Sequence, residues 1–371
     1  MTQTMKRYWK GTTIAATLAF GGCLALGLAD AIAQGKENPA PLVMASAEDP
    51  NNPSETLVPA AYVPSQKSED GGIEAGSSDG TRVFGGRPAA EGAYPWQAAL
   101  MMGQVDPNDP EARFNAQFCG GTLLTREWVL TAAHCVFDGD GNRLQPGAFQ
   151  ILTGTTDLRQ GGDFREVGQV IVHEAYDPVL LENDIALVRL SQSIGNSSGP
   201  VGAIRIARSP QEVREGSALL IGWGRTEDGS FPYDLLETDL DLVANEVCNR
   251  GLQSLYEDEL AMMLERLGGS NRVPEAARRQ AYDILVGSGF QAVPETQLCA
   301  GVASGERSSC NGDSGGPLMV RDAEGRLVQV GIVSWGRVPL TADGSCGHAN
   351  LYTSYTRIPS YFDWIASHVQ R

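Results

Sequence analysis

From Arg82 to the C-terminus the chain is a succession of short apolar runs separated by turn-forming residues, and this pattern constrains the fold more than any other feature. Runs of this length and composition are typical of β-strands in a sandwich or barrel. The 44 Gly and 20 Pro among the 371 residues supply the turns between them. We therefore expect an all-β domain with strands at residues 96–102, 120–124, 128–132, 150–152, 169–172, 185–190, 217–221, 235–243, 297–301, 317–320, 327–335 and 351–355.

Residues 1–33 predict a signal peptide rather than part of this fold. Basic residues precede an apolar stretch at 11–29, and small residues permit cleavage after Ala33. An uncleaved anchor helix and a lipid-modified Cys23 are the alternatives, although paired glycines interrupt the stretch and the flanks of Cys23 fit lipidation poorly. The prediction is a secreted or periplasmic protein with no stable membrane span after processing.

Residues 34–82 predict a disordered acidic prosegment. The segment is rich in Pro, Ser and Gly, is nearly free of aromatic residues, and carries eight acidic against three basic side chains. Such a composition cannot bury enough apolar surface to form a core. A solvated linker is the alternative interpretation.

Charge and cysteine content narrow the class of protein further. The 28 basic and 45 acidic side chains give a formal net charge of -17, which repels phosphate backbones and excludes nucleic acid as an expected partner. Removal of the signal peptide leaves six of the seven cysteines. An even number in an exported chain predicts three disulfides.

Two motifs place a histidine and an aspartate where acid–base chemistry can use them. His134 follows an apolar run beside Cys135, which can anchor it, and the ordinary pKa of histidine suits a general base near neutral pH. Asp184 stands at the head of the apolar run 185–190, where burial is costly unless the carboxylate accepts hydrogen bonds. Each residue alone also fits a structural role, as a packing histidine or a strand-capping aspartate.

A third motif surrounds Ser314 with glycines in the segment NGDSGG at 311–316. Glycines let the backbone turn so that successive N–H groups converge on one point, which stabilisation of a tetrahedral oxyanion requires. A glycine-rich turn can also be a plain loop. The order His, Asp, Ser along one chain favours a nucleophilic serine.

These segments resemble the trypsin/chymotrypsin family of serine endopeptidases over residues 83–371. The resemblance implies two six-stranded antiparallel Greek-key β-barrels with the site in the cleft between them, a C-terminal helix, and a helical insertion in the second barrel. Further matching motifs are VFGG at 83–86, YPWQ at 94–97, FCGG at 118–121, GWG at 222–224, SWG at 334–336 and YFDWI at 361–365.

The resemblance implies catalytic roles for the three motif residues. Ser314 is the nucleophile, His134 the general base and Asp184 the residue that orients the imidazole. The backbone N–H groups of Gly312 and Ser314 form the oxyanion hole. No metal and no cofactor are expected, because the calcium-loop glutamates of trypsin have no clear match around residues 152–166.

The resemblance also implies a zymogen and a disulfide scheme. Cleavage after Arg82 frees the amino group of Val83, which pairs with Asp313 beside the nucleophile. Six cysteines allow fifteen connectivities from spacing alone. The family selects the pairs Cys119–Cys135, Cys248–Cys299 and Cys310–Cys346.

Substrate selection is implied by residues of the primary pocket. Ser308, six residues before the nucleophile, occupies the floor, where an Asp selects Lys or Arg in the family. Ser334, Trp335 and Gly336 form the substrate-binding segment, and Gly336 leaves one wall of the pocket open. The pocket is therefore expected to be uncharged, and the side chain before the scissile bond (P1) hydrophobic.

The segment LYTSY at 351–355 can be aligned with the family in two ways, and the two alignments assign different residues to the other wall of the pocket. In the first, Thr353 lies on the wall and shortens the pocket for medium aliphatic side chains, or turns aside to admit Phe, Tyr and Leu. In the second, Tyr352 takes the place of Tyr355 and Asn350 lines the wall.

The segment of about 50 residues between Cys248 and Cys299 is an insertion relative to most of the family. Apolar residues at helical spacing predict a helical insertion at about 250–290, broken near Gly268. It is interpreted as a surface hairpin that buries its apolar faces, or as an exosite. The stripes are Tyr256, Leu260, Met263, Leu264 and Leu267, and Ala277, Ala281, Ile284 and Leu285.

The expected function is that of a secreted serine endopeptidase, made as a zymogen and acting on protein or peptide substrates. An activating trypsin-like protease is an expected partner, because Arg82 does not match an uncharged pocket, and a proteinaceous inhibitor is a candidate partner. The alternative is a catalytically weak or highly selective relative that acts mainly as a binding or regulatory protein. Such relatives usually lack His, Asp or Ser of the triad, and this chain keeps all three.

Overall fold

The computed structural model describes residues 84–195, 197, 199–267, 274, 276–277, 280, 292–342 and 346–369. The predicted signal peptide and prosegment, with Arg82 and Val83, lie outside these residues, as does most of the second helical stripe. The chain divides into two compact units, one of residues 59–251 and 293–371 and the other of residues 1–58 and 252–292. Both β-barrels belong to the first of these units.

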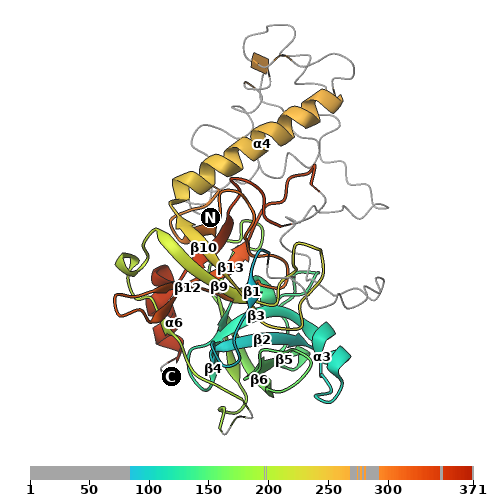
Figure 1. The fold of residues 1–371 in the computed structure, drawn as a ribbon, viewed down its shortest axis with the longest axis vertical. Coiled ribbons are helices and arrows are strands. Elements are labelled where there is room, and N and C mark those ends of the chain that lie inside the picture. The colour runs from blue at the N-terminus through green and yellow to red at the C-terminus, as the bar shows by residue number, and fades with distance from the viewer. Residues whose placement is uncertain are drawn as a thin grey trace, which may run out of the picture. The chain divides into compact units, whose positions relative to one another are not determined.

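Six antiparallel strands close the first barrel (Figure 1). Their order is β2-β3-β4-β7-β6-β5, and the pairing of β5 with β2 completes the ring. Closure leaves no strand edge without a partner. The strands are β2 Gln97–Met102, β3 Gln117–Leu123, β4 Trp128–Thr131, β5 Phe149–Thr153, β6 Asp163–Val172 and β7 Ala186–Leu190.

The second barrel closes because β9 pairs with both β10 and β12. The ring runs β9-β10-β11-β14-β13-β12, and all of its pairs are antiparallel. Two short strands extend it, β1 Arg87–Pro88 on β10 and β8 Arg205–Ile206 on β13. The six strands are β9 Gly216–Gly222, β10 Leu236–Val243, β11 Gln297–Gly301, β12 Pro317–Arg321, β13 Leu327–Trp335 and β14 Thr353–Arg357.

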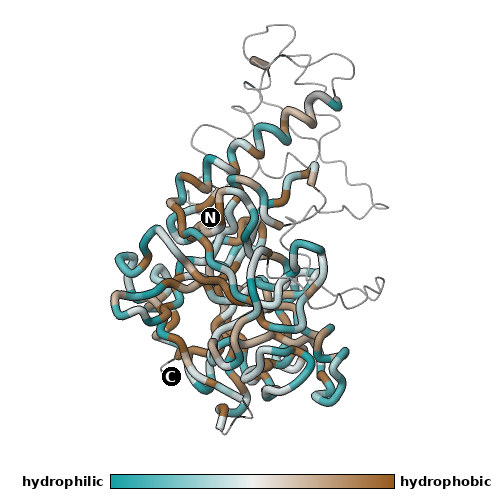
Figure 2. The backbone as a smooth tube through the Cα atoms, viewed as in Figure 1, coloured by the Kyte–Doolittle hydropathy of each residue, from teal (hydrophilic) through white to brown (hydrophobic). Residues whose placement is uncertain are grey.

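Three groups of buried apolar side chains make up the core. One fills the first barrel and includes Leu130, Ile151 and Leu187, and a second fills the second barrel around Tyr355. The third joins strands of both barrels, with members such as Met101 from β2, Ile221 from β9 and Met319 from β12. Figure 2 shows the hydrophobic stretches along the barrel strands and the hydrophilic residues in the surrounding loops. The two barrels therefore pack against each other through apolar side chains.

Helices are few in the described part of the chain. The C-terminal helix α6 Phe362–Val369 buries Ile365 in the core of the first barrel. The insertion begins with α4 Asn245–Leu267, as the first helical stripe predicts. The remaining helical segments are α3 Pro110–Ala116, η2 His134–Val136, η3 Pro146–Ala148, η4 Pro210–Glu212 and η5 Ile358–Tyr361.

The prediction of two six-stranded barrels and a C-terminal helix is confirmed, and each expected run overlaps a barrel strand. The largest difference lies in β6, which begins at Asp163 rather than at 169. Its first half carries Asp163, Arg165 and Glu166 on a partly exposed strand, so it lacks the apolar signal used to locate strands.

Candidate active site

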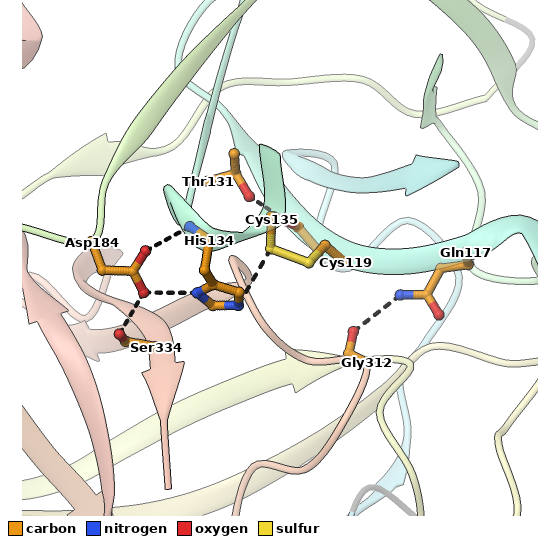
Figure 3. Close-up of a disulfide and its surroundings, with 9 residues drawn as sticks. Gln117, Cys119, Thr131, His134, Cys135, Asp184, Gly312 and Ser334 are labelled. Atoms are coloured by element: carbon orange, nitrogen blue, oxygen red, sulfur yellow. Dashed lines mark hydrogen bonds and ion pairs between the residues drawn. A yellow bond between two sulfur atoms is a disulfide. The ribbon is translucent and has the colours of Figure 1, made fainter. Parts of the chain in front are cut away.

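His134 and Asp184 meet through two hydrogen bonds (Figure 3). Asp184 Oδ2 lies 2.8 Å from His134 Nδ1, and Asp184 Oδ1 accepts the backbone N–H of His134 at 2.9 Å. His134 begins η2, three residues after the end of β4, and Asp184 lies two residues before β7, which pairs with β4. The pairing of these two strands therefore brings the two motifs together.

Asp184 is fully buried, and its oxygen atoms accept further hydrogen bonds. Ser334 Oγ donates to Asp184 Oδ2 at 2.5 Å, and Thr356 Oγ1 donates to the Asp184 carbonyl at 2.7 Å. Burial alone would raise the pKa of Asp184, but the His134 imidazole and the hydrogen bonds from His134 and Ser334 outweigh it and hold that pKa below its usual value. The carboxylate is thus ionised and its Oδ2 holds the imidazole through Nδ1.

In the segment around Ser314, the backbone donors of Gly312 and Ser314 are uncommitted among the residues that the structure describes. The N–H groups of Asp313, Gly315 and Gly316 donate to the carbonyls of Cys310, Val333 and Asp313. Those of Gly312 and Ser314 donate to no acceptor within the described part of the chain. Gly312 has φ +98°, a conformation that other residues rarely adopt. These two N–H groups flank Asp313 and are the pair that the family resemblance implies as oxyanion donors.

Ser314 lies on the loop between β11 and β12 and is less buried than its neighbours. Gly120 of β3 donates its N–H to the Ser314 carbonyl at 2.7 Å, which fixes this loop to the first barrel. The His134 Nε2 atom contacts Cys135 Sγ at 3.7 Å (Figure 3). Within the described part of the chain, no hydrogen bond joins His134 Nε2 to Ser314 Oγ.

Gln117 is a site residue that motif analysis does not reveal. It is 1% exposed on β3, and its Nε2 donates to the Gly312 carbonyl at 3.0 Å (Figure 3). This bond fixes the peptide that follows the first predicted oxyanion donor. The available signal was a polar residue directly before the FCGG motif, at the start of a strand whose residues are all buried.

Asp313, directly before Ser314, is buried. Its Oδ1 accepts the N–H of Gly224 at 2.8 Å and its Oδ2 that of Cys310 at 2.9 Å. A side chain at Gly224 would collide with the carboxylate, since a Cβ there would lie 2.2 Å from Oδ2. Burial raises the pKa of Asp313 to about 7, against the lowering effect of the two backbone hydrogen bonds.

The stability of the full-length chain should therefore depend on pH through Asp313. Because its pKa of about 7 in the folded state lies above the usual 3.8, the stabilisation is complete below about pH 4 and is lost as pH rises through 7. We expect the free-energy difference between the chain and its Asp313→Asn variant to change by about 2 to 3 kcal/mol between pH 7.5 and 5. Urea unfolding at several pH values measures it, with Asp241→Asn, an exposed acid on β10, as control. A pH-independent difference would contradict the expectation.

The residues predicted for the primary pocket lie together. Ser308 Oγ and Thr353 Oγ1 are 3.1 Å apart and both residues are buried. A Cβ on Gly336 would lie 3.5 Å from Thr353 Oγ1, so Thr353 and Gly336 face each other. None of these three residues carries a charge.

The structure shows where the residues of both alignments lie. Thr353 and Tyr355 both lie on β14, and Tyr355 is fully buried in the core of the second barrel. Asn350 lies outside the strand, is exposed and has φ +61°. Trp335 ends β13, directly after Ser334, and its indole N–H donates to Gln297 at 3.2 Å.

Three disulfides form with the connectivity that the resemblance implies, Cys119–Cys135, Cys248–Cys299 and Cys310–Cys346. The first is adjacent to His134 (Figure 3). The third includes Cys310, which lies four residues before Ser314. Cys119 and Cys135 approach His134 as metal ligands would, but their sulfurs are bonded to each other and offer no thiolate.

The side chain of Arg113 reaches the loop around residues 157–161, where the sequence shows no clear match to the calcium-binding glutamates of trypsin. Arg113 of α3 is 3% exposed and donates to the carbonyls of Leu158 and Gly161 at 2.9 and 2.6 Å. Asp157 pairs with Arg159 at 3.1 Å instead of facing an open site. The guanidinium thus satisfies backbone oxygens in this loop.

Arg82 and Val83, the predicted activation residues, lie outside the described residues. The chain that follows them is placed: the carbonyl of Phe84 accepts the N–H of Ser308 at 3.2 Å. The start of the predicted mature domain therefore contacts the predicted pocket floor. Over the described ranges, no helix has both the length and the apolar character needed to cross a membrane.

Comparison with known proteins agrees with this geometry. The Trypsin family model matches residues 83–365. Transmembrane protease serine 11B of Homo sapiens is 31% identical over 290 residues, 78% of this chain and 56% of that protein. Serine proteinase stubble of Drosophila melanogaster is 31% identical over 296 residues, 78% of this chain and 31% of that protein. Complement factor I of Mus musculus is 31% identical over 298 residues, 78% and 39% of the two chains. The chain thus matches only part of the length of each relative.

Proposed function

The chain belongs to the trypsin family, and from this premise we propose that it is a secreted serine endopeptidase, made as a zymogen and activated by cleavage after Arg82. The observation that carries the proposal is the fully buried Asp184, which holds His134 through Nδ1 at 2.8 Å while His134 presents Nε2 to the other side. A buried carboxylate that holds an imidazole in this way is suited to act together with that histidine in catalysis.

In the proposed mechanism Ser314 Oγ attacks the carbonyl carbon of the scissile peptide bond, and His134 Nε2 takes its proton. Asp184 keeps the imidazole in the tautomer that leaves Nε2 free, and stabilises the imidazolium that forms. The N–H groups of Gly312 and Ser314 bind the oxyanion, each contributing about 3 kcal/mol to the lowering of the barrier. His134 then returns the proton to the leaving amine, and water releases the acyl group.

We further propose the domain organisation that the sequence predicts: a signal peptide at 1–33, a prosegment at 34–82 and the protease domain at 83–371. The contact of Phe84 with Ser308 supports an activation site at this point, because it places the chain after Arg82 against the predicted pocket. A trypsin-like protease is the proposed activator, since an uncharged pocket does not select Arg82.

The rival proposal is a relative that binds a protein partner without general catalysis. The test uses the full chain cut after Arg82 by an added protease, which is then inactivated, and a peptide library varied at P1. Cleavage that vanishes in Ser314→Ala supports the peptidase. Absence of cleavage in protein with a free Val83 would favour either a highly selective protease or the binding protein.

The pocket residues predict a P1 preference for Ala, Val and Leu over Phe and Tyr. Thr353→Gly removes the side chain that faces Gly336 and should raise the ratio of kcat/KM for Phe over Val at least tenfold. Thr153→Gly, at a buried threonine on β5 of the other barrel, is the matched control and should leave the ratio unchanged. A preference for Arg or Lys in the unmodified enzyme would refute the role assigned to Ser308.

A further inference from the structure

Gln297 is a buried polar residue in an apolar strand. It begins β11, is 2% exposed, and precedes Leu298 and Cys299, which are buried as well. Burying an amide side chain costs free energy unless its hydrogen bonds are made. Gln297 makes three: its Nε2 donates to the Leu181 carbonyl at 2.9 Å, and its Oε1 accepts from Trp335 Nε1 at 3.2 Å and from Ser354 Oγ at 2.7 Å.

The three partners come from three separate segments, each adjacent in sequence to part of the candidate active site. Leu181 is three residues before Asp184, Trp335 directly follows Ser334, and Ser354 directly follows Thr353. One side chain thus joins a loop of the first barrel to two strands of the second.

Neither Trp335 nor the loop before Asp184 is held by strand pairing alone. The pairing of β13 with β14 shifts register between Val333 and Trp335, so the ladder does not set the orientation of the indole. Leu181 has φ +50°, and the two residues before it, Val179 and Leu180, are 62% and 47% exposed. Gln297 supplies a fixed hydrogen-bond partner to both segments.

We propose that Gln297 is a positioning residue that holds Trp335 and the 179–181 loop for contact with the apolar peptide segment preceding P1. This inference rests on the proposed function. A peptide that reaches only the P1 pocket gains nothing from Gln297, whereas a longer peptide gains binding from surfaces that are already in place. Gln297 therefore contributes to KM for extended substrates more than to kcat.

The test compares Gln297→Met with the unmodified enzyme on two chromogenic substrates that share one P1 residue. One is a tetrapeptide with apolar residues before P1, and the other is a blocked single amino acid. Methionine has a similar length but cannot make the three hydrogen bonds. We expect KM for the tetrapeptide to rise about tenfold with kcat changed less than twofold, and a much smaller change of KM for the single residue.

Gln329→Met is the matched control. Gln329 is also a fully buried glutamine of the second barrel, and its Nε2 donates only to the Gly331 carbonyl, at 3.1 Å. This variant should lose stability without a change in the ratio of the two KM values. Equal effects of Gln297→Met on both substrates, or the same KM ratio in both glutamine variants, would overturn the inference.

Trp335→Phe removes the indole donor and keeps an aromatic ring. It should shift KM in the same direction, and the double variant Gln297→Met/Trp335→Phe should lose less than the sum of the two single effects. If Gln297→Met does not fold, Trp335→Phe decides alone: an unchanged KM for the tetrapeptide would overturn the inference. Failure of the unmodified enzyme to cleave either substrate would instead contradict the proposed function.

Discussion

Replacing Ser314 by alanine is expected to reduce kcat on a peptide substrate about 10⁶-fold while the fold and melting temperature stay the same. The variant removes the proposed nucleophile but keeps the backbone N–H of residue 314 and the His134–Asp184 hydrogen bond. Steady-state hydrolysis by protein cut after Arg82 measures the loss. A variant with full activity would refute the assignment of Ser314.

Non-additivity separates a catalytic role of Ser314 from general damage. If Ser314 and His134 act as one unit, the double variant Ser314→Ala/His134→Ala should be about as inactive as either single variant. Ser304→Ala, at an exposed serine of the loop that precedes the site, is the matched control and should keep full activity. Losses that simply multiply in the double variant would indicate two independent structural effects.

A covalent probe distinguishes a weak enzyme from a binding protein. A fluorophosphonate reacts with a serine that an adjacent base activates, so it should label the cut protein at Ser314 and leave Ser314→Ala unlabelled. Labelling without hydrolysis of short peptides would indicate a highly selective protease. An unlabelled protein would favour the binding role instead.

The triad motifs could be located from sequence because each combines a distinctive residue with a recognisable local pattern. His134 follows β4, Asp184 precedes β7, which pairs with β4, and the glycines around Ser314 indicate a turn. The helical stripe beginning at Tyr256 likewise predicted a helix, and α4 covers it. In these cases the pattern and the structure arise from the same local physics.

Gln117 and Gln297 could not be assigned in the same way. Each is one polar residue in an apolar strand, and its role depends on partners more than 100 residues away, the Gly312 carbonyl for Gln117 and the Leu181 carbonyl for Gln297. Sequence shows that such a residue needs hydrogen bonds, but only the closed barrels show which groups provide them. Arg113 is a third example, because its acceptors belong to a loop of the first barrel distant in sequence.

Blocking cleavage after Arg82 is expected to leave the chain about 10³-fold less active than the cut form. The free amino group of Val83 would pair with Asp313, and loss of a buried ion pair costs about 3–5 kcal/mol. Each 1.4 kcal/mol corresponds to a factor of ten. Arg82→Gln prevents the cut, and hydrolysis of one peptide before and after treatment with a trypsin-like protease measures the difference. Equal turnover by cut and uncut chains would refute the proposed zymogen.

Asp313 provides an independent test of the same activation step. In the cut protein Asp313→Asn should lose about as much activity as uncut protein does, whereas Asp241→Asn should lose none. The uncut chain should gain stability as pH falls through about 7, because its Asp313 is buried and binds a proton readily. A positive amino group beside the carboxylate would lower that pKa, so cutting should abolish this trend. If the trend persists after the cut, Val83 and Asp313 do not pair, and activation must act through another part of the chain.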